Sequence, residues 1–353
     1  MPRRILLLIT DLEIGGTPTV VRELATRLKA PNTHVEVASL KDLGPNGALL
    51  ASRDVPVTAL HAGGVLTLPA VVHRLRRLVR SRDIDTVLSF LVHANVVASF
   101  AVPRNIRLLQ SIQTTQPRPA WHWRVQRWAA RRAERVIVPS TSVVDAAVQR
   151  SHVPREKFVV IPNAVDPADF TRSTVPLSPP EHYPIGFIGR LDPVKRVTDL
   201  VEAVCPIGRH VTLDIFGDGP DRENIERRIE GAGADTVTLR GIIRRPQEVL
   251  PGMGLLVLPS EAEGFGLVLI EAMAAGVPVV ATDAPGIRDV VQHEVNGLLV
   301  PVGAPAALTA AIERVISDVS LRARLIENGL KTVHERYTWD RILPLYRAAL
   351  GVV

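Results

Sequence analysis

Short apolar runs alternate along this chain with segments of helical periodicity, the pattern of a parallel α/β protein. The runs are rich in Leu, Ile and Val at nearly every position, which is typical of strands buried on both faces of a sheet. They lie at 5–10, 34–40, 55–60, 86–90, 107–112, 136–139, 158–161, 185–188, 211–216, 237–241, 255–258 and 277–281. Helical spacing is clear at 19–28, 71–82 and 197–204. We therefore expect an α/β fold with doubly wound parallel sheets.

A stretch rich in Pro, Ser and Thr divides the strand-rich regions. It occupies residues 169–183 and predicts a linker between a first domain, 1–168, and a second domain that begins at 184. With 353 residues the chain is long enough for two domains of ordinary size.

The segment 255–282, LLVLPSEAEGFGLVLIEAMAAGVPVVAT, predicts a strand, a glycine loop, a helix over 265–275 and a second strand. Such a loop lies where open α/β sheets bind ligands, outside the carboxyl ends of the strands. The helix is apolar on nearly every side, yet it carries Glu271, and a buried carboxylate without partners is costly. Glu271 either forms a structural salt bridge or reaches solvent, or it accepts hydrogen bonds from ligand hydroxyls.

The loop itself offers groups for an anionic ligand. Glu263 stands eight positions before Glu271, and Gly264 and Gly266 let backbone amides approach a ligand at the helix N-terminus. Carboxylates for hydroxyls, with amides for phosphates between them, suit a sugar nucleotide.

Two cations follow the strand at 185–188. Gly189-Arg190 and Lys195 precede the helix at 197–204, so both side chains lie at a strand's carboxyl end. Cations in this position can clamp a diphosphate. Taken alone, they are also common as surface charges.

Composition excludes several classes of protein. The chain is 46% hydrophobic and 22% charged, and no apolar run approaches the roughly 18 to 20 residues that cross a bilayer. The apolar run of MPRRILLLIT is short and ends at Asp11 and Glu13, so we interpret it as a first strand rather than a signal peptide. The single cysteine, Cys205, excludes an intrachain disulfide and favours a reducing cytoplasm.

Positive charge is concentrated in the first half. Residues 1–168 hold 23 Lys and Arg against 12 Asp and Glu, and the remainder holds 19 against 24. This asymmetry suggests an anionic partner, a phospholipid surface or an acidic acceptor, and an arginine-rich coding bias without any function is the alternative. No nucleic-acid-binding motif accompanies the charge, so we expect no nucleic acid.

Two basic segments are candidates for membrane contact. Residues 71–82 form an amphipathic basic helix, which either packs on the sheet with a solvated face or lies on a membrane. In residues 118–135, Trp121, Trp123 and Trp128 are interleaved with arginines, which suits lipid phosphates at a bilayer interface. Arg–aromatic stacking within the fold is the alternative.

The segment Glu263-GFGLVLI-Glu271, continued by AMAAGVPVVAT, resembles the Glu-x7-Glu motif of the retaining GT-B glycosyltransferases of family 4. Gly189-Arg190-Leu191 with Lys195, GDGP at 217–220 and VIPNAVDPADF at 160–170 extend the resemblance over nearly the whole chain. It implies a GT-B fold, two Rossmann-like domains facing across a cleft. The second, nucleotide-sugar domain would span 184–335, and residues 336–353 would cross back to the first.

The resemblance also implies residue roles. Arg190 and Lys195 would stabilise the leaving diphosphate, and Glu263 would hold the donor sugar. Donor-binding positions would be Gly15, Gly16, Gly189, Gly264, Phe265, Gly266, Leu267, Glu271, which holds the ribose, and Ile242, in the loop that contacts the base.

On the acceptor or sugar side the resemblance suggests His93, Asn95 and Gln113. Many members have a histidine where Gln113 stands. Glutamine can donate and accept hydrogen bonds but does not titrate, so the proton and sugar contacts of that histidine are not carried over to this chain. Thr17-Pro18 also replaces a dipeptide that many members share, and its contacts are not carried over.

The predicted activity is transfer of a sugar from a UDP- or GDP-sugar to a hydroxyl of a lipid-linked or glycan acceptor, with retention at the anomeric carbon. We expect no cofactor and no metal, and a cytoplasmic protein that contacts the inner face of the membrane. A sugar-nucleotide epimerase and a non-catalytic nucleotide-sugar-binding relative remain alternatives. An NAD(P) dehydrogenase is disfavoured because GxGxxG is absent near Gly15.

Overall fold

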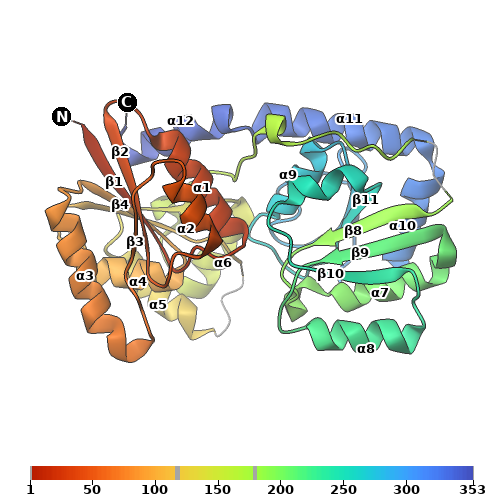
Figure 1. Ribbon diagram of the computed structural model, residues 1–353, viewed down its shortest axis with the longest axis horizontal. Coiled ribbons are helices and arrows are strands. Elements are labelled where there is room, and N and C mark those ends of the chain that lie inside the picture. Colours follow the sequence, from red (N-terminus) through yellow and green to blue (C-terminus); the bar gives the residue numbers. More distant parts are fainter. Residues whose placement is uncertain (1, 116–119, 178–180, 353) are drawn as a thin grey trace. The chain divides into compact units, whose positions relative to one another are not determined.

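The computed structural model describes residues 2–115, 120–177 and 181–352. It divides into two compact units (Figure 1), one formed by Met1–Asn163 and Ile342–Val353, the other by Ala164–Arg341. Each unit contains one parallel sheet with helices on both faces. The predicted fold class, two doubly wound α/β domains, is therefore confirmed.

The first unit is built on a seven-stranded sheet of order β3-β2-β1-β4-β5-β6-β7, in which every described pairing is parallel. Its strands are β1 Arg3–Ile9, β2 Thr33–Ser39, β3 Val57–Ala59, β4 Thr86–Phe90, β5 Arg107–Ser111, β6 Arg135–Val138 and β7 Phe158–Val160. The central strands are buried on both faces, as their unbroken apolar character predicts.

The helices of the first unit are α1 Gly16–Leu28, α2 Gly44–Ala51, α3 Leu68–Ser81, α4 Val92–Ala101, α5 Trp121–Ala130 and α6 Thr141–Ser151. In Figure 1, α3, α4 and α5 follow one another along one face of the sheet, and α4 packs against both neighbours. Helix α12, Trp339–Leu350, closes the chain. Its last turn is held in the first unit by Arg107, whose Nη1 donates to the Leu350 carbonyl at 2.8 Å.

The second unit has a six-stranded parallel sheet of order β10-β9-β8-β11-β12-β13. Its strands are β8 Tyr183–Ile188, β9 Val211–Phe216, β10 Val237–Gly241, β11 Leu255–Leu258, β12 Val279–Thr282 and β13 Leu298–Val300. Its helices are α7 Val197–Val204, α8 Arg222–Ala232, α9 Leu267–Ala274, α10 Pro305–Ser317 and α11 Val319–Arg336. Helix α7 packs against α8 and α10, and α9 packs against α11.

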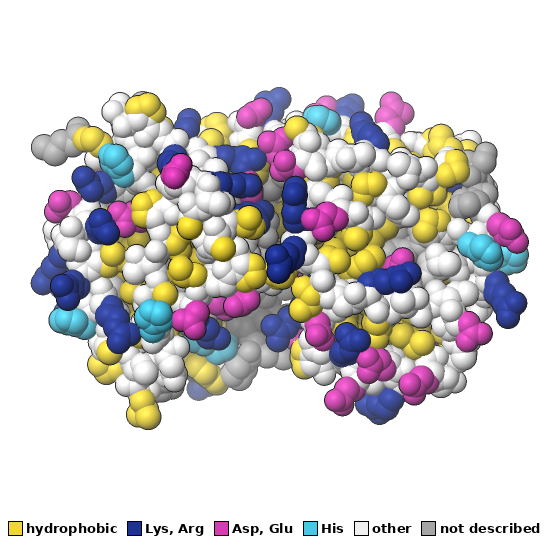
Figure 2. All heavy atoms as spheres, in the orientation of Figure 1, with side chains coloured by type: hydrophobic (Ala, Val, Ile, Leu, Met, Phe, Trp, Pro, Cys, Tyr) yellow, Lys and Arg dark blue, Asp and Glu magenta, His cyan; other side chains and the backbone are white. Residues whose placement is uncertain are grey.

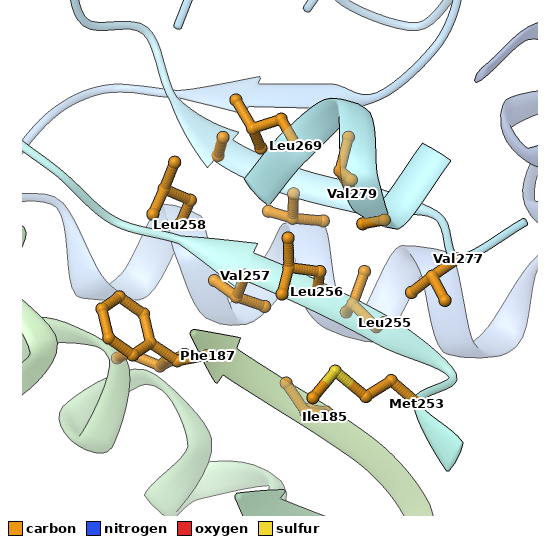
Figure 3. Close-up of a cluster of buried hydrophobic side chains, with 14 of the residues drawn as sticks. Ile185, Phe187, Met253, Leu255, Leu256, Val257, Leu258, Leu269, Val277 and Val279 are labelled. Carbon is orange, nitrogen blue, oxygen red and sulfur yellow. The ribbon is translucent and has the colours of Figure 1, made fainter. Parts of the chain in front are cut away.

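Strand β11 forms the centre of the second core (Figure 3). Its four residues, Leu255–Leu258, are at most 2% exposed, and they lie between Ile185 and Phe187 of β8 and Val279 of β12. Leu269 of α9 covers the same strand. Because burial of a Leu or Ile side chain contributes about 1.5–3 kcal/mol, this cluster fixes the carboxyl end of β11 firmly.

Several predicted boundaries are wrong by two or three residues, and three of them have a clear physical reason. Helix α1 begins at Gly16 rather than 19, because Pro18 is favoured in a first turn, where its missing N–H costs nothing. Helix α9 begins at Leu267 rather than 265, since Gly266 is left-handed with φ +78°. Strand β12 begins at Val279 rather than 277, after Pro278.

The described part of the predicted linker packs on the second unit. The Ser173 amide donates to the Ala275 carbonyl at 2.7 Å, and the Thr174 amide donates to Pro251 at 2.9 Å. The guanidinium of the buried Arg322 donates to the Leu177 carbonyl. Residues 178–180 of this stretch lie outside the described residues. Contacts with the second unit therefore fix residues 173–177.

Candidate functional site

Apart from Gly15 and Gly16, the predicted donor residues follow strands β8, β10 and β11, at the carboxyl edge of the second sheet. Strands β8 and β11 are neighbours although they are far apart in sequence, and from them the chain winds toward opposite edges. Doubly wound sheets bind ligands at such a switch point. The loop after β8 carries Arg190 and Lys195, and the loop after β11 carries Glu263.

These two loops meet through an ion pair. Lys195 Nζ lies 2.6 Å from Glu263 Oε1, and the two side chains are only 19% and 11% exposed. The same carboxylate oxygen accepts a hydrogen bond from Ser260 Oγ at 2.7 Å. A cation and an acid separated by 68 residues are therefore in direct contact, at a place shielded from water.

Backbone contacts hold the loop after β11 on both sides. The Glu261 amide donates to the Val194 carbonyl at 2.8 Å, and the Glu263 amide donates to the Pro285 carbonyl at 2.9 Å. Gly286 has φ +83°, and a Cβ on it would lie 2.2 Å from the Glu263 carbonyl oxygen. Only glycine permits the turn after β12 to approach Glu263 so closely.

The two neighbouring arginines differ in their surroundings. Arg190 is exposed, and its side chain forms no hydrogen bond or ion pair with any residue in the described ranges. Arg196 pairs with Asp199 in the first turn of α7, its Nε 2.7 Å from Oδ2. Arg190 is thus available to a ligand, whereas Arg196 is engaged within the fold.

The turn that carries Arg190 is fixed by the end of β9 and by the loop that follows it. The Gly189 amide donates to the Phe216 carbonyl at 3.0 Å, and the Leu191 amide donates to the backbone carbonyl of Asp218 at 3.0 Å. Ile242, after β10, is 60% exposed at the same edge of the sheet. Since parallel strands end together, the positions predicted to bind diphosphate and base occupy one edge.

The glycine loop leads into the N-terminus of α9. Gly264 and Gly266 are buried, and Leu267 begins the helix. Phe265 is 3% exposed and packs edge-on against Tyr337, with ring centroids 5.4 Å apart, so its side chain belongs to the core. Glu271 lies one turn into α9 and is 7% exposed. The predicted burial of the helix is confirmed, and Glu271 does not reach far into solvent, whereas its contact with a ribose stays a prediction.

In the first unit, Gly15 and Gly16 are exposed and open α1 directly after the loop that follows β1. His93 stands in the first turn of α4, after β4. Strands β1 and β4 are neighbours at the switch point of the first sheet. The three residues therefore lie along one carboxyl edge of that sheet.

His93 has polar neighbours that the sequence did not single out. Partial burial lowers its pKa, the positive charges of His122 and Lys41 lower it further, and Asp11 opposes them. The rings of His93 and His122 stand edge-on with centroids 5.3 Å apart. Because its pKa is lowered, the His93 imidazole stays neutral to a lower pH than that of a free histidine.

Asn95 lies inside the fold rather than at the surface of the site. It is fully buried, accepts a hydrogen bond from Ser89 Oγ at 2.7 Å, and donates at 3.0 Å to Gln126 Oε1 and to the Ser111 carbonyl. Gln113 is partly buried and donates to Ser111 Oγ at 2.7 Å. These contacts favour a structural role for Asn95 and leave Gln113 nearer the surface.

Sequence reasoning missed Ser260, Asp11, Lys41 and His122. Each of the first three follows a strand end, and that position is the only signal that marks them in the sequence. Among the described residues, no group of three or more His, Cys, Asp or Glu side chains could hold a metal ion. Within the same ranges, no helix combines the length and apolar character needed to span a membrane.

Two protein-family models match consecutive parts of this chain. The model described as Glycosyltransferase Family 4 matches residues 14–169, and the model described as Glycosyl transferases group 1 matches residues 172–332. The predicted site residues of both sheets lie within these ranges, Gly15, Gly16 and His93 in the first and Arg190, Lys195 and Glu263 in the second.

Individual relatives agree with the family models. An uncharacterized glycosyltransferase of Methanocaldococcus jannaschii is 31% identical over 59% of this chain and 57% of its own length. A GDP-mannose-dependent alpha-mannosyltransferase of Mycolicibacterium smegmatis is 36% identical over 66% of this chain and 62% of its own. The matches thus span less than two thirds of these relatives.

A solved structure extends the likeness to the whole fold. The crystal structure of Anabaena HepE in complex with UDP and glucose superposes with a TM-score of 0.89 over 99% of both chains, at 24% identity. This likeness concerns the fold.

Proposed function

This chain belongs to glycosyltransferase family 4, within the group 1 glycosyl transferases, and has the GT-B fold; on this premise we propose that it is a retaining hexosyltransferase. It moves a sugar from a UDP- or GDP-sugar to a hydroxyl of a lipid-linked or glycan acceptor. The observation that carries the proposal is the contact between Lys195 and Glu263, which joins the two loops at the switch point of the second sheet.

The donor's diphosphate is assigned to two cations. Arg190 is exposed at the turn after β8, and Lys195 follows five residues later at the same edge. Cations at this edge stabilise the charge that develops on a departing diphosphate, and the amides at the N-terminus of α9 add to this effect. Glu263 holds the donor sugar, and Glu271 the ribose hydroxyls.

The reaction proceeds on one face of the sugar. The bond between the anomeric carbon and the diphosphate oxygen breaks, and the bond to the acceptor oxygen forms on the same face. The acceptor's proton passes to the departing diphosphate, so no side-chain base is required. The protein's part is to position both substrates and to stabilise the leaving group.

The names of the relatives support the choice of donor. The Anabaena structure contains UDP and glucose, and the relative from M. smegmatis is named as dependent on GDP-mannose. On the acceptor side, His93 and Gln113 are the polar candidates along the carboxyl edge of the first sheet. A neutral His93 can accept a hydrogen bond from an acceptor hydroxyl.

Contact with an anionic membrane is part of the proposal. Residues 55–133 contain twelve arginines and no lysine, against only Asp83 and Asp85. In the described part of this segment, α3, α4 and α5 pack side by side. Figure 2 shows dark blue side chains gathered over the edge of the first unit where α3 lies. A surface of this charge complements anionic lipid headgroups.

The same helical layer exposes large apolar side chains. Trp121 is 53% exposed, Trp128 is 40% exposed, and Phe100 of α4 is 49% exposed and packs on Trp128 with ring centroids 4.5 Å apart. Trp123, by contrast, is 3% exposed and belongs to the core. Aromatic rings beside arginines suit the boundary between headgroups and acyl chains. Residues 116–119 of the predicted segment lie outside the described residues.

Vesicle sedimentation tests the membrane contact. The protein should bind vesicles of phosphatidylcholine mixed with phosphatidylglycerol, and phosphatidylcholine alone should bind it weakly. Trp128→Ala and Arg127→Glu should each reduce binding severalfold. The matched control is Leu49→Ala, which truncates a side chain 43% exposed on α2. Equal binding by all four proteins, or no binding, contradicts the contact.

The transferase activity is tested by incubating the protein with a panel of nucleotide sugars and measuring nucleotide release with and without lipid and glycan acceptors. Acceptor-dependent release supports transfer. Conversion of the donor without an acceptor would indicate an epimerase, and binding without turnover a non-catalytic relative. Unchanged activity after treatment with EDTA is expected, because Arg190 and Lys195 are proposed to take the place of a metal at the diphosphate. The anomeric configuration of the product, read by NMR, tests retention.

A further inference from the structure

Ser260 is a buried polar side chain to which neither the motif nor the proposed function assigns a role. It follows β11 by two residues and is 0% exposed. A buried hydroxyl requires hydrogen-bond partners, and the identity of those partners shows what the hydroxyl does.

Ser260 is held from the side of β12. Thr282, the last residue of that strand, is 3% exposed, and its Oγ1 donates to the Ser260 carbonyl. A weaker contact of 3.5 Å joins the same hydroxyl to the Leu258 carbonyl. The backbone at Ser260 is thus fixed to the carboxyl ends of two adjacent strands.

The side chain of Ser260 points to the ion pair. Its Oγ donates to Glu263 Oε1 at 2.7 Å, and Lys195 Nζ lies 2.6 Å from the same oxygen. Two donors on one carboxylate oxygen restrict rotation of the carboxylate. The contacts form a continuous series from Thr282 through Ser260 and Glu263 to Lys195.

We infer that Ser260 is a positioning residue: it orients Glu263, and Glu263 in turn places the Lys195 ammonium at the switch point. The inference rests on the proposed function, in which Lys195 stabilises the diphosphate. Because Ser260 is 0% exposed and its hydroxyl is bonded to Glu263, it acts through Glu263 and not directly on a ligand. Its contribution is to hold a flexible lysine, which has four rotatable carbon–carbon bonds, in one place before the donor binds.

A serine that only stabilises the loop would behave differently. Its removal would lower the stability of the protein and would leave turnover per folded molecule unchanged. Removal of a hydroxyl that acts through Lys195 must lower turnover, and the effect must vanish when Lys195 is already absent.

The test is a double-mutant cycle of Ser260→Ala and Lys195→Ala, followed by both activity and unfolding. We expect Ser260→Ala to lower kcat about tenfold or more, as for loss of a hydrogen bond to a charged group. In the Lys195→Ala background the same change should have little effect. Ser260→Thr, which keeps the hydroxyl, should recover part of kcat. Equal effects of Ser260→Ala in both backgrounds would overturn the inference.

A control variant shows whether loss of any partly buried serine hydroxyl in this unit lowers kcat, or only loss of the Ser260 hydroxyl. Ser173 is partly buried in the same unit and donates to the Met253 carbonyl at 2.8 Å, far along the chain from the ion pair. Ser173→Ala should shift the unfolding midpoint and leave kcat unchanged. Loss of kcat in this control as large as in Ser260→Ala contradicts a specific role for Ser260.

The unfolding measurements on the same four proteins of the double-mutant cycle can be made even if no enzymatic activity is found. Changes in unfolding free energy for Ser260→Ala and Lys195→Ala should be non-additive, because both side chains bond to one oxygen. If the two changes in unfolding free energy are additive, the contacts of Ser260 and Lys195 with Glu263 are not coupled, and the inference is contradicted. If the wild-type protein binds neither UDP nor GDP, the proposed function is contradicted. The unfolding measurements still test whether Ser260 and Lys195 interact through Glu263.

Discussion

Replacement of Lys195 by alanine is the most informative single change in the proposed site. It removes an ammonium that lies 2.6 Å from Glu263 Oε1, and it leaves the backbone of the loop after β8 intact. The loop amides still form their hydrogen bonds, including that of Lys195 itself to the Asp192 carbonyl at 2.7 Å. The variant should therefore fold.

The cost in stability follows from burial. The two side chains are 19% and 11% exposed, so the pair lies between an exposed ion pair and a fully buried one. Removing one partner of a buried pair costs about 3–5 kcal/mol, and an exposed pair contributes about 0–1 kcal/mol. Ser260 still donates to the Glu263 carboxylate in the variant. We therefore expect the unfolding free energy to fall by about 1–2 kcal/mol, between the values for an exposed and a buried pair.

The cost in turnover should be larger. A fixed donor to a developing charge contributes about 10²–10³ in kcat, and Lys195 is assigned to the leaving diphosphate. Nucleotide release measured at saturating donor and acceptor should therefore fall by about this factor in Lys195→Ala. Lys195→Arg, which keeps the charge, should fall less.

A matched lysine provides the control. Lys331 lies 4.0 Å from Glu335 on α11, with both side chains at least 60% exposed. Lys331→Ala should leave both stability and turnover nearly unchanged. If folded Lys195→Ala turns over at the wild-type rate, the assignment of Lys195 to the diphosphate is refuted.

Three further predictions concern Glu271, Gly286 and His93. Glu271→Gln should weaken donor binding about tenfold or more, measured by calorimetry, and an unchanged dissociation constant would indicate a structural carboxylate. Gly286→Ala should destabilise by about 2 kcal/mol or more, because its Cβ would lie 2.2 Å from the Glu263 carbonyl oxygen; Gly231→Ala on α8, with open space, should not. His93 should titrate below pH 6.5 by NMR, and Lys41→Ala should raise its pKa. Since that pKa is lowered on folding, His93 should reduce stability as pH falls below about 6.5, and a pKa at or above the ordinary value contradicts this.

The strands and the two-domain architecture could be predicted because buried parallel strands are apolar at every position. Val237–Gly241 and Leu255–Leu258 are observed as predicted. Several element ends could not be predicted, because they depend on single residues such as Gly266, whose left-handed φ places the start of α9 at Leu267.

The site could be predicted only in part. Glu263 and Lys195 were assigned to separate ligand groups, and their mutual ion pair depends on the pairing of β8 with β11, which no local pattern encodes. Asn95 shows the same limit. Its place after a strand suggested a ligand contact, but hydrogen bonds to Gln126 and to the Ser111 carbonyl engage it inside the fold. The exposed pairing of Phe100 with Trp128 joins two helices and was likewise invisible in the sequence.

The proposed function depends on binding of a nucleoside diphosphate by Arg190 and Lys195 at the carboxyl edge of the second sheet. Isothermal titration calorimetry of the wild-type protein and of Lys195→Ala against UDP and GDP tests it most directly. We expect one of the two nucleotides to bind the wild-type protein and to bind the variant about tenfold or more weakly. Equal affinity in the two proteins, or no binding of either nucleotide, would contradict it.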